Sequence, residues 1–360
     1  MDKKRSKKKT AFIVFLVVIL LLFAADWIAS VCIYNSYFGR RYETYEPYAL
    51  YIGDFPGLER TRYEFTSEKG DTLAGYMYSE GEGQKGIIII AHGFGGGGHN
   101  SYMNVADLFA RNGYYVFAYD ATGNDESGGD SVGGLAQGVA DLNSAIDFVE
   151  KSGNFPSLPI GLFGHSWGGY CVSSVLSYHP EVRAVIECSG FNCSSDMFEA
   201  QGKAEAGDGI YLMMPFVKLQ EQIKCGEYAS ATGMKGFEST DAHIMAVHSA
   251  DDNVVPIGYG FDKYYEKYSA DPRFTFIRLE DKGHNHIFDD VTYYKVFFED
   301  MQEWTDSLDY DYKAEENQQR FADDKAEYIR QHMDREKWSH SLDKELSEKF
   351  VTFYDENMQG

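Results

Sequence analysis

A serine between two glycines is the residue best placed in this chain for covalent chemistry. Ser166 lies at the centre of a G-x-S-x-G motif whose outer residues are Gly164 and Gly168. An apolar run at 160–163 precedes the motif and a helical pattern at 170–178 follows it. A strand before and a helix after would hold the hydroxyl on a tight, exposed turn, and the glycines leave room for a close backbone approach. The motif therefore predicts a nucleophilic serine.

A glycine-rich loop supplies a second element of the same chemistry. Residues 92–98 read HGFGGGG and follow an apolar run that contains four isoleucines. Acyl transfer needs two N–H donors at the developing oxyanion, and the backbones of Phe94 and Trp167 would provide them. A flexible turn is the alternative, whereas a phosphate loop would need a Lys-Ser/Thr pair after the glycines. The residues that shape the two motifs are His92, Gly93, Gly95, Gly164, His165 and Gly168.

A serine hydroxyl also needs a base, and the base needs an orienting carboxylate. For a serine in such a strand–turn–helix motif, the acid and then the histidine are expected after the serine in the chain. Asp251 and Asp252 come directly after an apolar strand pattern at 244–247, and His284 and His286 follow the last strand pattern. The residues alone leave both choices open.

Strand and helix patterns alternate around these motifs and would bring them together. The alternation predicts an α/β protein with a doubly wound, mostly parallel, eight-stranded sheet, the first two strands antiparallel. Functional groups collect at the carboxyl ends of strands in such sheets. The predicted strands are 62–66, 72–78, 86–91, 114–119, 159–163, 184–188, 244–247 and 274–279, and the clearest helices are 104–111, 139–150 and 167–178.

On these motifs the chain resembles the α/β-hydrolase superfamily, particularly its serine-peptidase and esterase-like members. The resemblance covers about residues 60–306, and it implies the α/β-hydrolase fold with a catalytic domain at 61–306. It includes a D-x-x-G-x-x-x-S-G-G loop after the fourth strand, whose matching residues are Asp120, Gly123, Ser127, Gly128 and Gly129.

The same resemblance implies a choice between the competing acids and histidines. The family acid precedes the proline of a D-x-x-V-P turn by four residues, which matches Asp252 and Pro256. The family histidine follows a glycine, which matches Gly283 and His284. We therefore expect Asp252 and His284 to serve Ser166, and the neighbouring acid and histidine are the alternatives.

Two segments interrupt the alternation. Residues 191–240 are expected to form a cap insertion, in which the apolar run 211–216 either lines a pocket or packs as a helix. Residues 307–360 predict a helical C-terminal extension. The amphipathic stretch 342–354 could close the sheet, which would make about 310–340 an insertion.

The N-terminus predicts a membrane anchor. Residues 1–10 are basic, 11–34 are mostly apolar, and 35–60 have the composition of a juxtamembrane linker. About 20 apolar residues suffice to span a bilayer as a helix. Asp26 adds roughly 3 kcal/mol to the free energy of membrane insertion, but the twelve apolar residues at 12–23 contribute roughly −4 to −7 kcal/mol to it. Insertion is therefore favoured. The basic flank favours a single-pass cell-membrane protein with a cytoplasmic N-terminus and an extracytoplasmic domain, over the alternative of a cleaved signal peptide.

Composition narrows the range of partners. The net charge is −23 although the first ten residues are basic, so the folded body should repel nucleic acid. No H-E-x-x-H or cysteine spacing indicates a metal, and the expected chemistry requires no cofactor. Cys193 and Cys225 could pair in an extracytoplasmic domain, and buried free thiols are the alternative.

The sequence thus favours a serine hydrolase with a small-molecule or peptide acyl substrate, bound to a membrane by its N-terminal helix. Ester hydrolysis ranks first because it asks least of the leaving group, and a serine aminopeptidase or other peptidase is second. A different class is a non-catalytic, membrane-tethered binding module on a hydrolase scaffold. Because a fold does not determine its chemistry, the scaffold itself does not choose between these.

Overall fold

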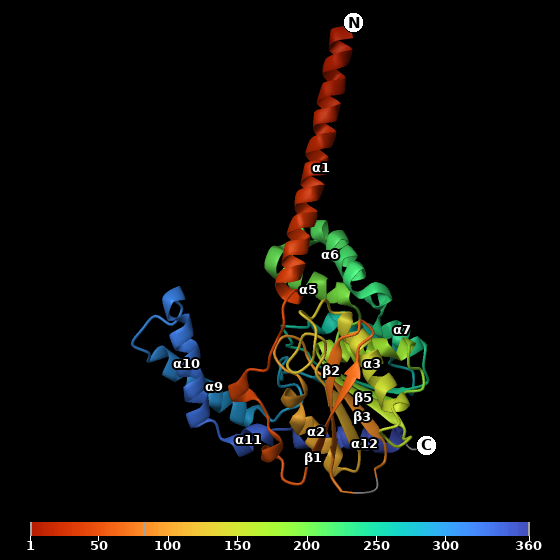
Figure 1. Ribbon diagram of the computed structural model, residues 1–360, viewed down its shortest axis with the longest axis vertical. Coiled ribbons are helices and arrows are strands. Elements are labelled where there is room, and N and C mark those ends of the chain that lie inside the picture. Colours follow the sequence, from red (N-terminus) through yellow and green to blue (C-terminus); the bar gives the residue numbers. More distant parts are fainter. Residues whose placement is uncertain (1, 82–83, 359–360) are drawn as a thin grey trace.

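The computed structural model describes residues 2–81 and 84–358, with side chains from residue 9 onwards, so most side chains of the basic tail at 1–10 lie outside the described ones. A single long helix, α1, leads into a layered α/β domain, and a helical arm projects from the domain's side (Figure 1).

One sheet of eight strands forms the centre of the domain, in the order β1-β2-β4-β3-β5-β6-β7-β8. The strands from β3 onwards are parallel, whereas β1 pairs antiparallel with β2, and β2 with β4. The predicted mostly parallel, eight-stranded sheet is confirmed. The strands are β1 Glu59–Thr66, β2 Thr72–Ser79, β3 Ile87–Ala91, β4 Tyr115–Tyr119, β5 Ile160–His165, β6 Ala184–Cys188, β7 His243–Ser249 and β8 Phe274–Leu279.

The central strands are apolar on both faces because helices cover both. Every residue of β3 and β5 is buried. The chain passes from β3 to β4 on one side and then returns to β5 on the other, so strand order reverses between β3 and β5. Loops at the carboxyl ends of these two strands therefore diverge and leave a crevice, the usual ligand site of open α/β sheets.

Two hydrophobic layers sandwich the sheet. One layer contains α3 (Gln137–Lys151), α4 (Trp167–Ser174) and α8 (Phe261–Tyr268). The other contains α2 (Met103–Arg111), α9 (Val291–Asp306) and α12 (Lys344–Asn357). Tyr354 of α12 is fully buried, and its hydroxyl donates a hydrogen bond to the Leu162 carbonyl of β5, 2.6 Å away. The final helix is thus part of the sheet's cover.

The remaining C-terminal helices, α10 (Gln318–His332) and α11 (Arg335–Ser339), form the arm in blue in Figure 1. They pack on the segment between α1 and β1, for which the sequence suggests a linker. Trp338 stacks on Tyr48 with ring centroids 5.0 Å apart, and its indole N–H donates to the Tyr48 carbonyl. Ala49, Leu50, Phe55 and Leu58 of that segment are buried. Residues 46–58 are therefore ordered against the domain.

The cap lies between β6 and β7 and consists of α5 (Ser194–Ala206), α6 (Ile210–Cys225) and α7 (Gly233–Glu238). In α6, Met214 and Val217 are buried, whereas Tyr211 and Leu212 are exposed. The five cysteines are free, so Cys193 and Cys225 do not form a disulfide.

Helix α1 runs from Asp2 to Phe38. Its part from Lys9 onwards is long and apolar enough to cross a membrane, a test that a signal sequence also passes. Its end is a packed part of the domain, since Ser30, Tyr34 and Phe38 recur every four residues and are buried.

Candidate active site

Ser166 occupies a strained turn between β5 and α4. Its φ and ψ of 57° and −116° are unusual for a non-glycine residue, and its N–H donates to the Cys188 carbonyl at 2.8 Å. The flanking glycines are sterically required. A Cβ on Gly164 would lie 2.2 Å from the Gly168 carbonyl oxygen, and one on Gly168 would lie 2.0 Å from that of Ala91. The turn therefore holds the serine side chain at the crevice edge.

The structure brings Ser166, His284 and Asp252 together. The Ser166 Oγ lies 2.8 Å from the His284 Nε2, and the His284 Nδ1 lies 2.7 Å from an Asp252 carboxylate oxygen. A carboxylate can only accept, so Nδ1 carries the proton and Nε2 is left to accept from the hydroxyl. Such an arrangement can deprotonate a serine.

Asp252 is fixed by further donors. Its other oxygen accepts hydrogen bonds from the Val254 and Val255 N–H groups at 2.9 and 2.8 Å. His248, fully buried on β7, places its Nε2 3.3 Å from the oxygen that His284 contacts. Although burial opposes ionisation, the hydrogen bonds from His248 and His284 hold the pKa of Asp252 well below its usual range. The carboxylate therefore stays charged at neutral pH.

The alternative acid and histidine lie elsewhere. Asp251 is exposed and accepts from the Ser249 hydroxyl and the Gly283 N–H at 2.6 and 2.9 Å, which ties the two loops together. His286 contacts Asp289 at 3.1 Å and stacks on Tyr294, so it is directed away from Ser166. Of the two aspartates and the two histidines, only one of each therefore lies in the hydrogen-bonded path to Ser166.

A chain of hydrogen bonds runs behind the reactive groups. The Gly93 N–H donates to the Tyr102 hydroxyl at 3.0 Å, and that hydroxyl lies 2.9 Å from the His165 Nδ1. The His165 Nε2 in turn lies 3.0 Å from the His284 carbonyl oxygen. Burial and the nearby His284 lower the pKa of His165 to about 3. His165 is therefore neutral and does not compete with His284 for a proton.

The glycine-rich loop after β3 is anchored at His92 and Phe94. The His92 Nδ1 donates to the Gly93 carbonyl, and its Nε2 accepts from the Ala121 N–H at 3.0 Å. Phe94 packs on Trp167 with ring centroids 5.6 Å apart. Trp167 is the first residue of α4, so its N–H has no acceptor within the helix. Gly95 adopts a φ of 92°, which glycine tolerates best.

The loop after β4 braces the glycine-rich loop. Asp120 is fully buried and accepts from both the backbone N–H and the Nδ1 of His99 at 2.8 Å. Ser127 accepts from the Ala74 N–H at 2.9 Å, and Gly123 and Gly129 have positive φ values. This loop thus supports the site without contacting Ser166.

Sequence reasoning missed the second layer around Asp252. His248 and Glu187 lie on adjacent strands, β7 and β6, and both are fully buried. Burial raises the pKa of Glu187 to about 7. The only signal in the sequence was that Glu187, a charged residue, lies within an apolar strand pattern. Tyr102 lies after the glycine run, and no sequence pattern around it indicates a role in the site.

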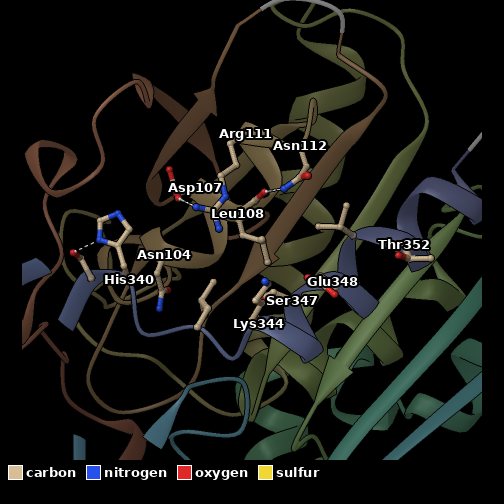
Figure 2. Close-up of a pocket in the computed structure, with 13 residues that line it drawn as sticks. Asn104, Asp107, Leu108, Arg111, Asn112, His340, Lys344, Ser347, Glu348 and Thr352 are labelled. Carbon is tan, nitrogen blue, oxygen red and sulfur yellow. Dashed lines mark hydrogen bonds and ion pairs between the residues drawn. The ribbon is translucent and has the colours of Figure 1, made fainter. Parts of the chain in front are cut away.

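A groove of about 580 Å³ lies away from these residues, between α2 and α12. Figure 2 shows Asp107 and Arg111 on one wall and Lys344 and Glu348 on the other. Its lining mixes charged and polar residues with Leu108, Leu342 and Val351 and includes none of the site residues.

Within the described side chains, one group has metal-ligand chemistry: Asp147, Glu150 and His179, whose ligand atoms lie within 4.8 Å of one another. Asp147 already pairs with Lys151, and His179 with Glu181 at 2.7 Å. The site around Ser166 contains no such group.

Comparisons with known proteins agree with this fold. A family described as serine aminopeptidase, S33, matches residues 82–225. A monoacylglycerol lipase from Mycolicibacterium smegmatis is 26% identical over 133 residues, which are 36% of this chain and 46% of that protein. The chain thus matches less than half the length of that curated relative.

Solved structures share the architecture. A Pyrococcus furiosus esterase is similar with a TM-score of 0.51 and 18% identity, over 68% of this chain and 90% of that chain. A Pyrococcus horikoshii acylaminoacyl peptidase is similar with a TM-score of 0.50 and 17% identity, over 70% of this chain and 42% of that chain. The sheet order, the strand–serine–helix turn and these structural matches together show that the chain has the α/β-hydrolase fold.

Proposed function

We propose that the chain is a membrane-anchored serine hydrolase that cleaves carboxylic esters through an acyl-enzyme, with Ser166 as its nucleophile. The observation that carries this proposal is the continuous hydrogen-bonded path from the Ser166 hydroxyl through His284 to Asp252, at 2.8 and 2.7 Å.

In the first half of the reaction, His284 Nε2 takes the hydroxyl proton as Ser166 Oγ attacks the ester carbonyl. The tetrahedral intermediate collapses when the imidazolium returns that proton to the departing alkoxide, which leaves as an alcohol. In the second half, His284 removes a proton from water, and the hydroxide attacks the acyl carbon. The proton then returns to Ser166 as the carboxylic acid leaves.

Asp252 orients the imidazole and stabilises its charged form. The low pKa of Asp252 keeps its carboxylate ionised throughout the cycle. Backbone N–H groups of Phe94 and Trp167 are assigned to the oxyanion. The N-terminus of α4 adds its partial positive charge at the same place.

The acyl substrate is a small molecule or a peptide. The esterase and lipase among the similar proteins support ester hydrolysis. The serine aminopeptidase family supports amide hydrolysis as the second candidate, because the same nucleophile and base serve both.

Labelling with a fluorophosphonate tests the nucleophile. Wild type should be labelled, and Ser166→Ala, which keeps the turn backbone, should not. Failure of the folded wild type to react would refute catalysis and favour a binding module. A panel of p-nitrophenyl esters and aminoacyl anilides then ranks esterase against peptidase through kcat/KM.

Helix α1 is assigned as a single-pass anchor with a cytoplasmic N-terminus and an extracytoplasmic domain. Its apolar length and the basic residues before it support this assignment. Protease added to intact cells should release the domain. Full protection, with cleavage only after lysis, would reverse the orientation.

A further inference from the structure

Helix α1 contacts the cap at two heights. Phe23 and Phe216 of α6 form an edge-to-face pair with ring centroids 6.2 Å apart. Eleven residues further along α1, Tyr34 donates a hydrogen bond to the buried carboxylate of Glu221. Figure 1 shows α6, in green, beside the domain-proximal part of α1, in red. The two helices therefore lie side by side where α1 approaches the domain (Figure 1).

These contacts fix the depth of α6 if α1 crosses a bilayer. Lys9 is the last basic residue before the apolar run. A hydrocarbon core of about 30 Å takes about 20 residues at 1.5 Å per residue, so it ends near residue 29. Phe23 then lies roughly 9 Å inside that boundary, and Phe216 lies beside it. Tyr34 and Glu221 lie outside it.

The composition of α6 changes at the corresponding point. Residues 210–217 carry no charge, and charged residues begin at Lys218. In the uncharged half, Leu212 is 74% exposed and Tyr211 49% exposed. Exposed apolar side chains can mark an interaction surface, and Phe216 in the same half of α6 connects this one to Phe23 of α1.

We propose that the N-terminal half of α6, residues 210–217, is embedded in the same bilayer that α1 crosses. This inference rests on the anchor in the proposed function. The cap is also linked to the site, because Phe198 of α5 packs on Phe38, and Phe38 packs on Phe94 of the glycine-rich loop. The cap thus stands at the leaflet, where an acyl substrate dissolved in the membrane reaches it directly.

Quenching of tryptophan fluorescence by phosphatidylcholine brominated along its acyl chains tests the proposal in reconstituted full-length protein. Because Trp167, Trp304 and Trp338 fluoresce in every variant, the difference in quenching between wild type and Trp27→Phe reports on α1. In the Trp27→Phe background, Leu212→Trp reports on α6, and Ile223→Trp, at a position 63% exposed on its charged half, is the matched control. Each is measured as the quenching that it adds to the background. We expect Trp at 212 to be quenched comparably to Trp27, and Trp at 223 to be quenched little. Tyr211→Trp provides a second reporter.

The outcomes separate the two proposals. If Trp27 is not quenched, the anchor fails and the α6 proposal fails with it. If Trp27 is quenched but both reporters at 211 and 212 are not, the anchor stands and α6 insertion is overturned. Hydrolysis of a short soluble ester by each variant shows that the domain is folded. Leu212→Asp should then lower activity on a vesicle-embedded ester, relative to the soluble ester, more than Ile223→Asp does.

Discussion

Phe38, in the last turn of α1, packs directly against Phe94 of the glycine-rich loop, with ring centroids 5.4 Å apart. Phe94 contacts Trp167 in turn. The end of α1 therefore braces the two residues whose N–H groups are assigned to the oxyanion. This end of α1 is thus a structural part of the site.

Removing the Phe38 ring should weaken this brace. Phe38→Ala deletes a buried aromatic side chain, so the free energy of unfolding should fall by about 3 kcal/mol. Ile33→Ala, on the exposed side of the same helix, should change it by less than about 0.5 kcal/mol. Urea unfolding of both full-length variants in detergent measures the difference. Equal effects at the two positions would contradict the packing role.

The two adjacent aspartates should differ sharply in their effect on catalysis. Asp252→Asn removes the charge that holds the His284 tautomer, and kcat should fall by roughly 10³–10⁴-fold. Asp251→Asn weakens only the hydrogen bonds to Ser249 and Gly283, so it should cost about 1 kcal/mol of stability. Steady-state kinetics on a p-nitrophenyl ester make the comparison, and a larger kcat loss for Asp251→Asn would reverse the assignment.

Glycines in the two motifs should not be equally replaceable. Gly168→Ala would place a Cβ 2.0 Å from the Ala91 carbonyl, so the elbow must shift. We expect a loss of about 1–3 kcal/mol in stability together with a lower kcat. Gly96→Ala meets nothing within 4 Å and should leave both quantities nearly unchanged. Thermal unfolding and ester kinetics of the pair test this, and a tolerated Gly168→Ala would speak against the tight turn.

Much of the fold could be predicted because the central strands are almost wholly apolar. Ile87–Ala91 and Ile160–His165 are buried on both faces, and that uninterrupted pattern identifies parallel strands from sequence alone. Ser166, Asp252 and His284 were also predictable as candidates, since each follows a predicted strand. The family-like D-x-x-V-P and G-H patterns then favoured the pair that lies within hydrogen-bonding distance of the serine.

The rest depends on contacts between distant segments, which leave no local pattern. Nothing near Phe38 indicates that its ring meets Phe94, and nothing near Tyr48 indicates that Trp338 stacks on it. The segment 46–58 lies within the stretch 35–60, whose composition suggests a linker, yet tertiary packing orders it. The role of Glu187 was not predicted because its neighbours on β6 form an ordinary buried strand, which draws no attention to a functional residue.

Glu187 and His248 should make stability depend on pH. Burial raises the pKa of Glu187 to about 7. Although burial opposes protonation of His248, its contacts with Asp252 and Glu187 raise its pKa. Both groups bind protons more tightly in the folded state than in the unfolded one. Their contribution is therefore complete below the unfolded values, near pH 4.5 for the glutamate, and is lost as pH rises through about 7.

Glu187→Gln should remove the glutamate's part of this dependence. A shift from 4.5 to about 7 corresponds to about 3 kcal/mol between the two protonation states. Unfolding free energies of wild type, measured from pH 5 to pH 8, should decline more steeply than those of the variant. Glu266→Gln, at an exposed position on α8, serves as the control and should keep the wild-type slope. If Glu187→Gln leaves the slope unchanged, Glu187 is ionised at neutral pH in the folded protein, and His248 alone neutralises it.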